Sequence, residues 1–241
     1  MSTLKATTIE PATGTNVTLG TTGDTVSLPG NTLVLDTWKD SGGNTLFTSN
    51  GSGTVSSVNS GLAGAGPVLI QSQTASGDSS ISFTSGIDST YDKYMFVLTN
   101  LNISVNSEDL NLNFSLAGSF SSLNMVTTMI VQRHDEDGSD GSVFYQTNDD
   151  LANATNQKFA DSSQLGNGAD ESISGVLHLF GPSSTTYVKQ FYFSTIANSN
   201  VPGVTAAMVG GYVNNTGAVT QVQFGPSSGT FDGTIKLYGV K

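Results

Sequence analysis

Short β-prone runs separated by glycine, asparagine and serine recur along the whole chain, and this pattern restricts its fold most strongly. The 241 residues include 28 glycines. Glycine is unfavourable inside helices, whereas serine, threonine and asparagine hydrogen-bond to nearby backbone groups and favour turns. The pattern therefore predicts an all-β chain.

The longer runs lie in residues 67–241. Segment 110–116 alternates apolar and polar residues, which is typical of a strand with one buried and one solvated face. The number of runs fits two packed sheets, so we expect a jelly-roll-type antiparallel β-sandwich. The candidate strands are 68–73, 81–84, 94–100, 110–116, 125–132, 143–146, 173–180, 187–196, 208–213, 219–224 and 234–240. One helix is expected, around Asp149–Phe159.

Residues 1–60 have a different character, because their apolar runs are shorter, at 17–19, 26–28, 33–35, 46–47, 55 and 58. Such a thin segment cannot bury a core of its own. We interpret residues 1–60 as an extended β arm or stalk that anchors the chain, either wound with other copies or laid on a partner. A disordered linker is the alternative, because glycine and serine richness predicts that too. The Gly- and Ala-rich segment 60–67 ends in proline and marks the boundary.

The residues expected to anchor the arm are its apolar side chains. They are Leu4, Ile9, Val17, Leu19, Val26, Leu28 and Trp38. Trp38 is the sole tryptophan. A tryptophan buries a large area, so this one either contacts a partner or packs inside the stalk.

The chain is acidic, with a formal net charge of −11. It has no cluster of Lys and Arg, which excludes a nucleic acid partner and argues against an anionic membrane surface. No apolar run approaches the roughly 20 residues of a membrane-spanning helix. Cysteine is absent, which removes disulfides and thiolate metal sites. The amino terminus lacks the apolar core of a signal peptide, so we expect synthesis in a cytoplasm.

The densest acidic run is residues 134–141. Carboxylates this close together offer the oxygen ligands that Ca²⁺ prefers. Asp135, Asp137 and Asp140 are therefore candidate ligands of a structural calcium ion, and no other cofactor is expected. An EF-hand loop starting at Asp135 would need a glutamate where Gln146 stands. A solvated loop tip is the other interpretation.

Residues 225–229 read Gly-Pro-Ser-Ser-Gly and match the G-x-S-x-G pattern of hydrolases. That site needs a helix after the serine and a histidine later in the chain. Here a strand-like run follows, and His134 and His178 both come earlier. The similar string Gly-Pro-Ser-Ser-Thr starts at Gly181, so we interpret both strings as similar hairpin turns and expect no catalytic residue.

Several segments resemble recurrent strings of marine bacteriophage (cyanophage-like) virion proteins that are often described as tail-fibre-like. These segments are 4–11, 17–20, 23–26, 86–96, 177–184 and 233–240. The resemblance implies a β-rich surface or appendage protein, commonly homotrimeric, without defined catalytic residues.

We therefore expect a non-enzymatic virion surface protein, a tail fibre or fibre-like appendage that attaches to the host. Its partners would be other virion proteins, further copies of itself and a host surface glycan or receptor. The chain is short for a full tail fibre, so a capsid decoration or head-fibre protein bound through the arm is the alternative. A lectin and a polysaccharide depolymerase are further alternatives, which fold alone does not separate.

Overall fold

The structure is a computed structural model that describes residues 37–40, 42–49, 52, 55–58, 66–118, 120, 123–161, 165–198, 200 and 202–241. The chain divides into two compact units, Met1–Gly64 and Ala65–Lys241. The division falls inside segment 60–67. Among the described residues, no helix is long and apolar enough to cross a membrane.

The first unit contains a three-stranded antiparallel sheet in the order β1-β2-β3. Its strands are β1 (Thr37–Lys39), β2 (Thr45–Ser49) and β3 (Val55–Val58). The strands expected at 46–47, 55 and 58 are thus confirmed. Those expected at 17–19, 26–28 and 33–35 lie outside the described residues, as do Leu4, Ile9, Val17, Leu19, Val26 and Leu28.

Trp38 of β1 lies opposite Phe47 of β2, and the two rings stack with their centroids 5.6 Å apart. Trp38 is nevertheless 41% exposed. Packing inside the sheet and contact with a partner are therefore both compatible with its position.

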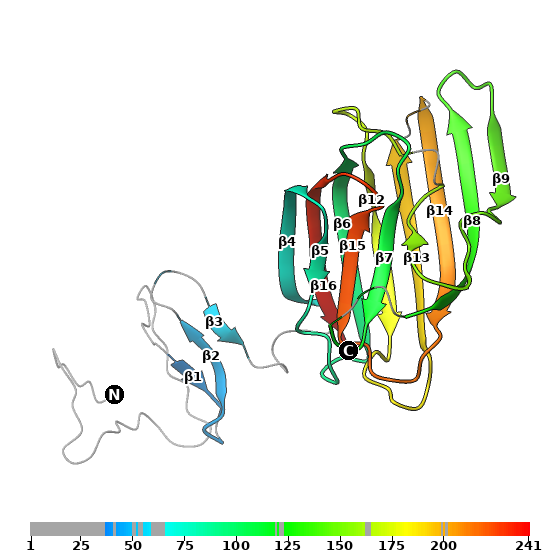
Figure 1. The fold of residues 1–241 in the computed structure, drawn as a ribbon. Helices are drawn as coiled ribbons and strands as arrows, with labels where there is room; N and C mark the ends of the chain where they lie inside the picture. Colours follow the sequence, from blue (N-terminus) through cyan, green and yellow to red (C-terminus); the bar gives the residue numbers. More distant parts are fainter. Residues whose placement is uncertain are drawn as a thin grey trace, which may run out of the picture. The chain divides into compact units, whose positions relative to one another are not determined.

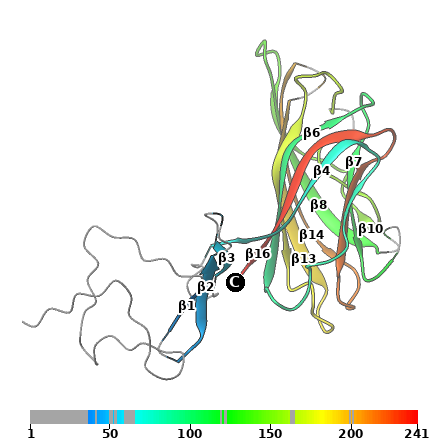
Figure 2. The same cartoon turned by 90° about the vertical axis from the view of Figure 1, so that its left-hand side faces the viewer.

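The second unit is an antiparallel β-sandwich of two unequal sheets (Figures 1 and 2). The larger sheet has nine strands in the order β10-β8-β14-β13-β12-β6-β16-β4, with β9 paired to β8. Its strands are β4 (Val68–Asp78), β6 (Lys93–Ile103), β8 (Met125–Asp135), β9 (Gly141–Tyr145), β10 (Ala152–Ala154), β12 (Ile173–Phe180), β13 (Lys189–Asn198), β14 (Gly203–Val213) and β16 (Phe231–Val240). The smaller sheet has the order β11-β7-β15-β5. Its strands are β5 (Ile81–Phe83), β7 (Leu110–Ser115), β11 (Gln157–Lys158) and β15 (Gln221–Pro226).

The predicted all-β fold and antiparallel sandwich are confirmed, and every candidate strand between 68 and 240 coincides with an observed one. From β4 to β8 the chain alternates between the two sheets, as in a jelly roll. The later strands β12, β13 and β14 depart from that alternation, because they are consecutive neighbours within the larger sheet.

The helix expected around Asp149–Phe159 is wrong, because β10 and β11 lie in this segment. Asn153 and Asn156 have φ angles of 62° and 64°. Those angles belong to the left-handed region, which breaks a right-handed helix and which asparagine tolerates better than most residues.

The core lies between the sheets and is rich in aromatic rings. Strand β13 shows the expected pattern, with buried and exposed residues alternating along its whole length. Phe83 of the smaller sheet meets Phe96 of the larger one edge to face, at 5.3 Å.

Strand β7 departs from the prediction for segment 110–116, because all six of its residues are buried. Leu110, Leu112 and Phe114 enter the core with no exposed surface. Asn111 and Asn113, on the opposite side, are only 8% exposed. The predicted solvated face is therefore wrong, since other segments cover much of this side of the smaller sheet.

Candidate functional site

The acidic run forms the turn between β8 and β9. The Asp135 amide donates to the Asp140 carbonyl at 3.0 Å, and Gly138 supplies a φ angle of 72°. The Asp135 carboxylate pairs with Arg133 Nε at 3.2 Å. The Asp137 carboxylate accepts the Ser139 amide at 2.8 Å. Hydrogen bonds from Ser139 lower the pKa of Asp137 below its ordinary value.

These contacts bear on the calcium prediction for Asp135, Asp137 and Asp140. Among the described residues, no group of three His, Cys, Asp or Glu side chains is arranged to hold a metal ion. Asp135 and Asp137 instead have protein partners within the hairpin. The structure therefore gives the calcium prediction no support and favours a solvated loop tip.

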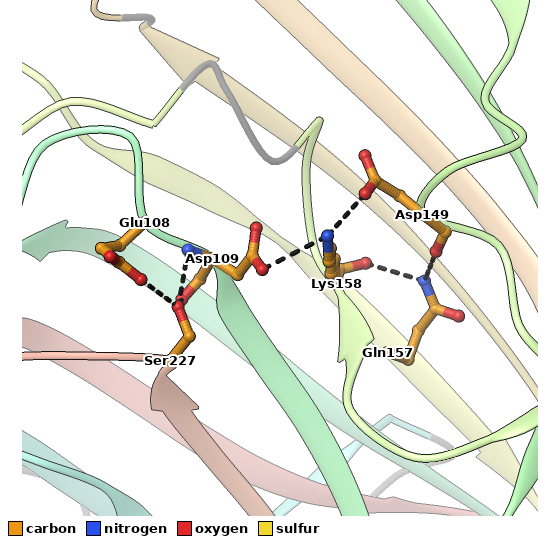
Figure 3. A network of polar contacts seen from close by, with 6 residues as sticks. All are labelled: Glu108, Asp109, Asp149, Gln157, Lys158 and Ser227. Atoms are coloured by element: carbon orange, nitrogen blue, oxygen red, sulfur yellow. Dashed lines mark hydrogen bonds and ion pairs between the residues drawn. The ribbon is translucent and has the colours of Figure 1, made fainter.

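The Gly-Pro-Ser-Ser-Gly segment at 225–229 begins with the last two residues of β15 in the smaller sheet and leads toward β16 of the larger one. The Ser227 hydroxyl donates to Glu108 and accepts the Asp109 amide, the latter at 3.1 Å (Figure 3). The Ser227 amide donates to the Asp109 carbonyl at 2.9 Å. Ser227 therefore fastens the end of β15 to the start of β7.

The hydrolase context is missing from this turn. A strand follows it where the hydrolase pattern needs a helix. His178 stacks on Tyr192, at 4.6 Å, in the larger sheet, and His134 lies on β8 of that sheet. The hairpin turn predicted at 181–184 is confirmed, whereas Gly225 and Pro226 are the last residues of β15 and only 227–229 lie between β15 and β16. Only the first connects neighbouring strands, so the second is not a hairpin.

Beside Ser227, an ion-pair network that sequence reasoning missed centres on Lys158 (Figure 3). Lys158 Nζ lies 2.7 Å from Asp149 Oδ1 and 3.3 Å from Asp109 Oδ2. The Asp149 side chain has no exposed surface. Gln157 Nε2 donates to the carbonyls of Asp149 and Lys158, at 3.0 Å each. The network thus fastens β11 to the segment before β10 and to the start of β7.

The pKa values in this network move for identifiable reasons. Burial raises the pKa of Asp109, although the Lys158 charge opposes the change. Burial also disfavours the charged form of Lys158, but the carboxylates of Asp149 and Asp109 outweigh it and raise the pKa of Lys158. The network brings Asp109 and Asp149 together, and Lys158 forms an ion pair with each of them. We therefore interpret the network as stabilising the fold.

The outer surface of the larger sheet exposes several large apolar side chains. We define the outer apolar face as the outward-facing residues of β8, β9, β13 and β14. Its most exposed large apolar members and their exposed fractions are Ile130 (45%), Val143 (71%), Tyr145 (50%), Tyr192 (46%), Ile196 (60%), Val204 (45%) and Met208 (54%).

The strand register brings these side chains next to one another. Met208 of β14 lies opposite Ile130 of β8, which in turn lies opposite Tyr145 of β9. Directly paired residues of antiparallel strands point to the same side of a sheet. The three side chains therefore form one continuous row across the face.

A hollow of about 540 Å³ lies at one end of this face, and its lining includes His134, Val143, Ile196, Val204 and the charged Arg133. Along β8, β13 and β14, which the structure describes in full, no outward-facing residue is Asp, Glu, Lys or Arg. The outer apolar face is therefore uncharged at its centre, although the chain carries a net charge of −11.

No protein-family model, curated protein or solved structure matches this chain.

Proposed function

We propose that this chain is a non-enzymatic structural protein that associates with copies of itself through the outer apolar face. The observation that carries the proposal is the combination of exposed apolar side chains and missing charge over β8, β13 and β14. Contiguous exposed apolar surface on a folded protein typically marks an interaction site.

A second copy is the partner that this chemistry suits best. The face needs a partner surface that is also apolar and uncharged, because a charge buried against it would lose its hydration without compensation. Another copy supplies such a surface. Two chains that each carry −11 repel one another, so contact is favoured where acidic groups are absent.

We further propose that the assembly belongs to a bacteriophage particle, as a homotrimeric tail fibre or fibre-like appendage that attaches to the host. This part of the proposal rests on the resemblance of segments such as 86–96 and 177–184 to phage virion proteins. In the proposed particle, residues 1–60 anchor the chain to other virion proteins and the sandwich projects outward.

The non-enzymatic part of the proposal draws on the surroundings of Ser227. Its hydroxyl donates to Glu108, and both histidines belong to strands of the other sheet. A serine nucleophile needs a base that can accept its proton and an oriented third group. The contacts of Ser227 with Glu108 and Asp109 instead hold the end of β15 against the start of β7.

Sedimentation velocity of the purified full chain tests self-association. We expect a trimer for the wild type and a folded monomer for Met208→Glu and Ile196→Glu, since each places a charge on the face. Tyr187→Glu is the matched control, because Tyr187 is 73% exposed but lies outside the strands of the face. A wild type that stays monomeric at high concentration, or face variants that stay trimeric, would sink the proposal.

Immunogold labelling of purified phage particles with an antibody to this chain tests the virion assignment. Label along the tail is the expected result. Label on the head would instead favour a capsid decoration or head-fibre protein, and particles without label would overturn the assignment altogether.

A further inference from the structure

The smaller sheet carries a polar pocket on the side that faces away from the core. Its volume is about 280 Å³. It is lined chiefly by Asn111 and Asn113 of β7, Gln223 of β15, and the nearby Ser80, Asn156 and Ser227. Every described residue that lines it is uncharged. We refer to this feature as the polar pocket.

The strand register explains how the pocket is built. Gln223 lies opposite Asn113, and Gly225 lies opposite Asn111. A Cβ atom at position 225 would come within 2.7 Å of the Ser79 carbonyl oxygen. Glycine at this position therefore lets the turn between β4 and β5 approach the sheet and form one wall.

Several amides of the pocket are held in place by hydrogen bonds. Asn113 Nδ2 donates to Asn156 Oδ1 at 2.8 Å, and the backbone N–H of Asn156 donates to Asn113 Oδ1 at 3.1 Å. Gln223 Nε2 donates to Ser82 Oγ at 3.0 Å. Because these side chains are fixed before any ligand arrives, less conformational entropy is lost on binding.

Asn111 differs from its neighbours. The residue is only 8% exposed, and its side-chain oxygen Oδ1 is buried with no hydrogen-bond partner among the described residues. Buried polar side-chain atoms nearly always have a partner, because an unmade hydrogen bond is costly. Because this oxygen is itself buried, a ligand in the polar pocket satisfies it only when the Asn111 side chain rotates, and the new hydrogen bond removes the cost of the unpaired acceptor.

We propose that the polar pocket binds a neutral sugar unit of a carbohydrate, with Asn111 as a ligand-binding residue. Sugar hydroxyls both donate and accept hydrogen bonds, as do the amide and hydroxyl groups of this lining. No arginine or lysine is present among the lining residues to hold a phosphate or carboxylate. Glu108, bonded to Ser227 at the pocket's edge, further disfavours an anionic ligand.

The size of the pocket limits what it takes. Its volume lies near the lower end of the roughly 300–1,000 Å³ of small-molecule sites, which suits one sugar unit or the end of a longer chain. No aromatic ring is among the described lining residues, so hydrogen bonds carry the binding. The expected affinity per site is therefore weak, with a Kd of about 1 mM.

The pocket does not depend on the proposed self-association. Reading the sugar as part of a host surface glycan, however, rests on the proposed function. The test must separate these two statements, and it can, because sugar binding is measurable on a monomer as well as on a trimer.

Ligand-detected saturation-transfer NMR of the full chain tests the site, with neutral glucose, galactose, mannose and N-acetylglucosamine as probes. We expect saturation of at least one probe, and binding about tenfold weaker or lost in Asn111→Leu. This variant fills the site without leaving a buried unpaired oxygen, so its thermal midpoint should be unchanged or raised. The exposed Asn124→Leu carries the same chemical change elsewhere and should bind like the wild type.

Three results would overturn the proposal. One is the absence of saturation for every neutral probe at about 50 mM, well above the expected Kd. A second is preferential binding of the anionic sugars glucuronate or N-acetylneuraminate. A third is a folded Asn111→Leu protein that binds as tightly as the wild type. A monomeric wild type that binds sugar would instead contradict self-association alone.

Discussion

The ring of Phe159 stacks on the ring of Phe224, with their centroids 5.6 Å apart. Phe159 also lies 4.6 Å from Phe193, which enters the core from the larger sheet, whereas Phe224 enters from the smaller one. A residue just past the two-residue strand β11 thus joins the inner surfaces of both sheets.

Replacing Phe159 by alanine should lower the free energy of unfolding by about 3–5 kcal/mol, because it leaves a cavity between the sheets. Urea denaturation followed by circular dichroism measures the loss. Phe144→Ala is the matched control and should cost clearly less, since Phe144 lies on the edge strand β9 and is only partly buried. Equal losses would show that Phe159 does not hold the two sheets together.

The pairing of β16 with β6 shifts its register between Asp232 and Thr234, and Gly233 lies at this bulge. Its φ angle is +125°, and a Cβ atom there would come within 2.5 Å of the Asn100 carbonyl oxygen. Gly233→Ala should therefore lower the free energy of unfolding by more than about 2 kcal/mol. Gly210 has open space around the position that a Cβ atom would take, and its φ is ordinary, so Gly210→Ala should change stability by less than about 1 kcal/mol. Similar melting temperatures for the two variants would contradict this account of the bulge.

Lys158 predicts a particular pH dependence. Its pKa is raised in the folded chain, so its stabilising contribution is fully present below the unfolded value of 10.5 and is lost as the pH rises through the folded value. Lys158→Met should lower the free energy of unfolding at pH 7 by about 1–3 kcal/mol, because it leaves Asp149 buried without its cation.

The difference between wild type and Lys158→Met should shrink as the pH rises above 10.5. Chemical denaturation between pH 7 and alkaline pH follows it, and the exposed Lys236→Met serves as control. A difference that stays constant through that range would mean that Lys158 acts through packing rather than through its charge.

Trp38 reports on the three-stranded sheet, because it is the sole tryptophan of the chain. Its ring stacks on Phe47 with an interplanar angle of 18°. Phe47→Ala removes that apolar neighbour and should shift the fluorescence emission to longer wavelength. Phe144→Ala should leave the emission unchanged. An unshifted Phe47→Ala spectrum would contradict the stacking.

The β-sandwich was predictable because its strands carry their signal locally. In β13, for example, inward Phe191, Phe193 and Thr195 alternate with outward residues, and period-two alternation needs no knowledge of distant segments. The helix predicted for segment 149–159 was wrong because Asn153 and Asn156 adopt the left-handed conformation beside the short strands β10 and β11. Composition does not reveal such backbone angles.

The ion-pair network and the polar pocket were not predictable either, because they depend on contacts between segments that are distant in the sequence. Nothing in the surroundings of Asp109 and Lys158 in the sequence indicates that their side chains meet, since only the pairing of β11 with β7 brings them together. Likewise, alternation places Asn111 on a solvated face, and only the fold shows that neighbouring segments bury it. The acidic run 134–141 is evident in the sequence, but in the hairpin the carboxylates bind different partners: Asp135 pairs with Arg133, and Asp137 accepts the Ser139 amide.

The outer apolar face and the polar pocket belong to different sheets, and each lies on the side of its sheet that is turned away from the core. In the proposed assembly, copies that associate through the outer apolar face would leave the polar pocket uncovered. Weak single sites displayed together on one particle gain avidity, because a second binding event becomes intramolecular, and the gain reaches about 10²–10⁴-fold when geometry permits. If both proposals hold, a sandwich with two chemically opposite sides would gain durable adhesion from millimolar contacts through copy number, with no change in any single site.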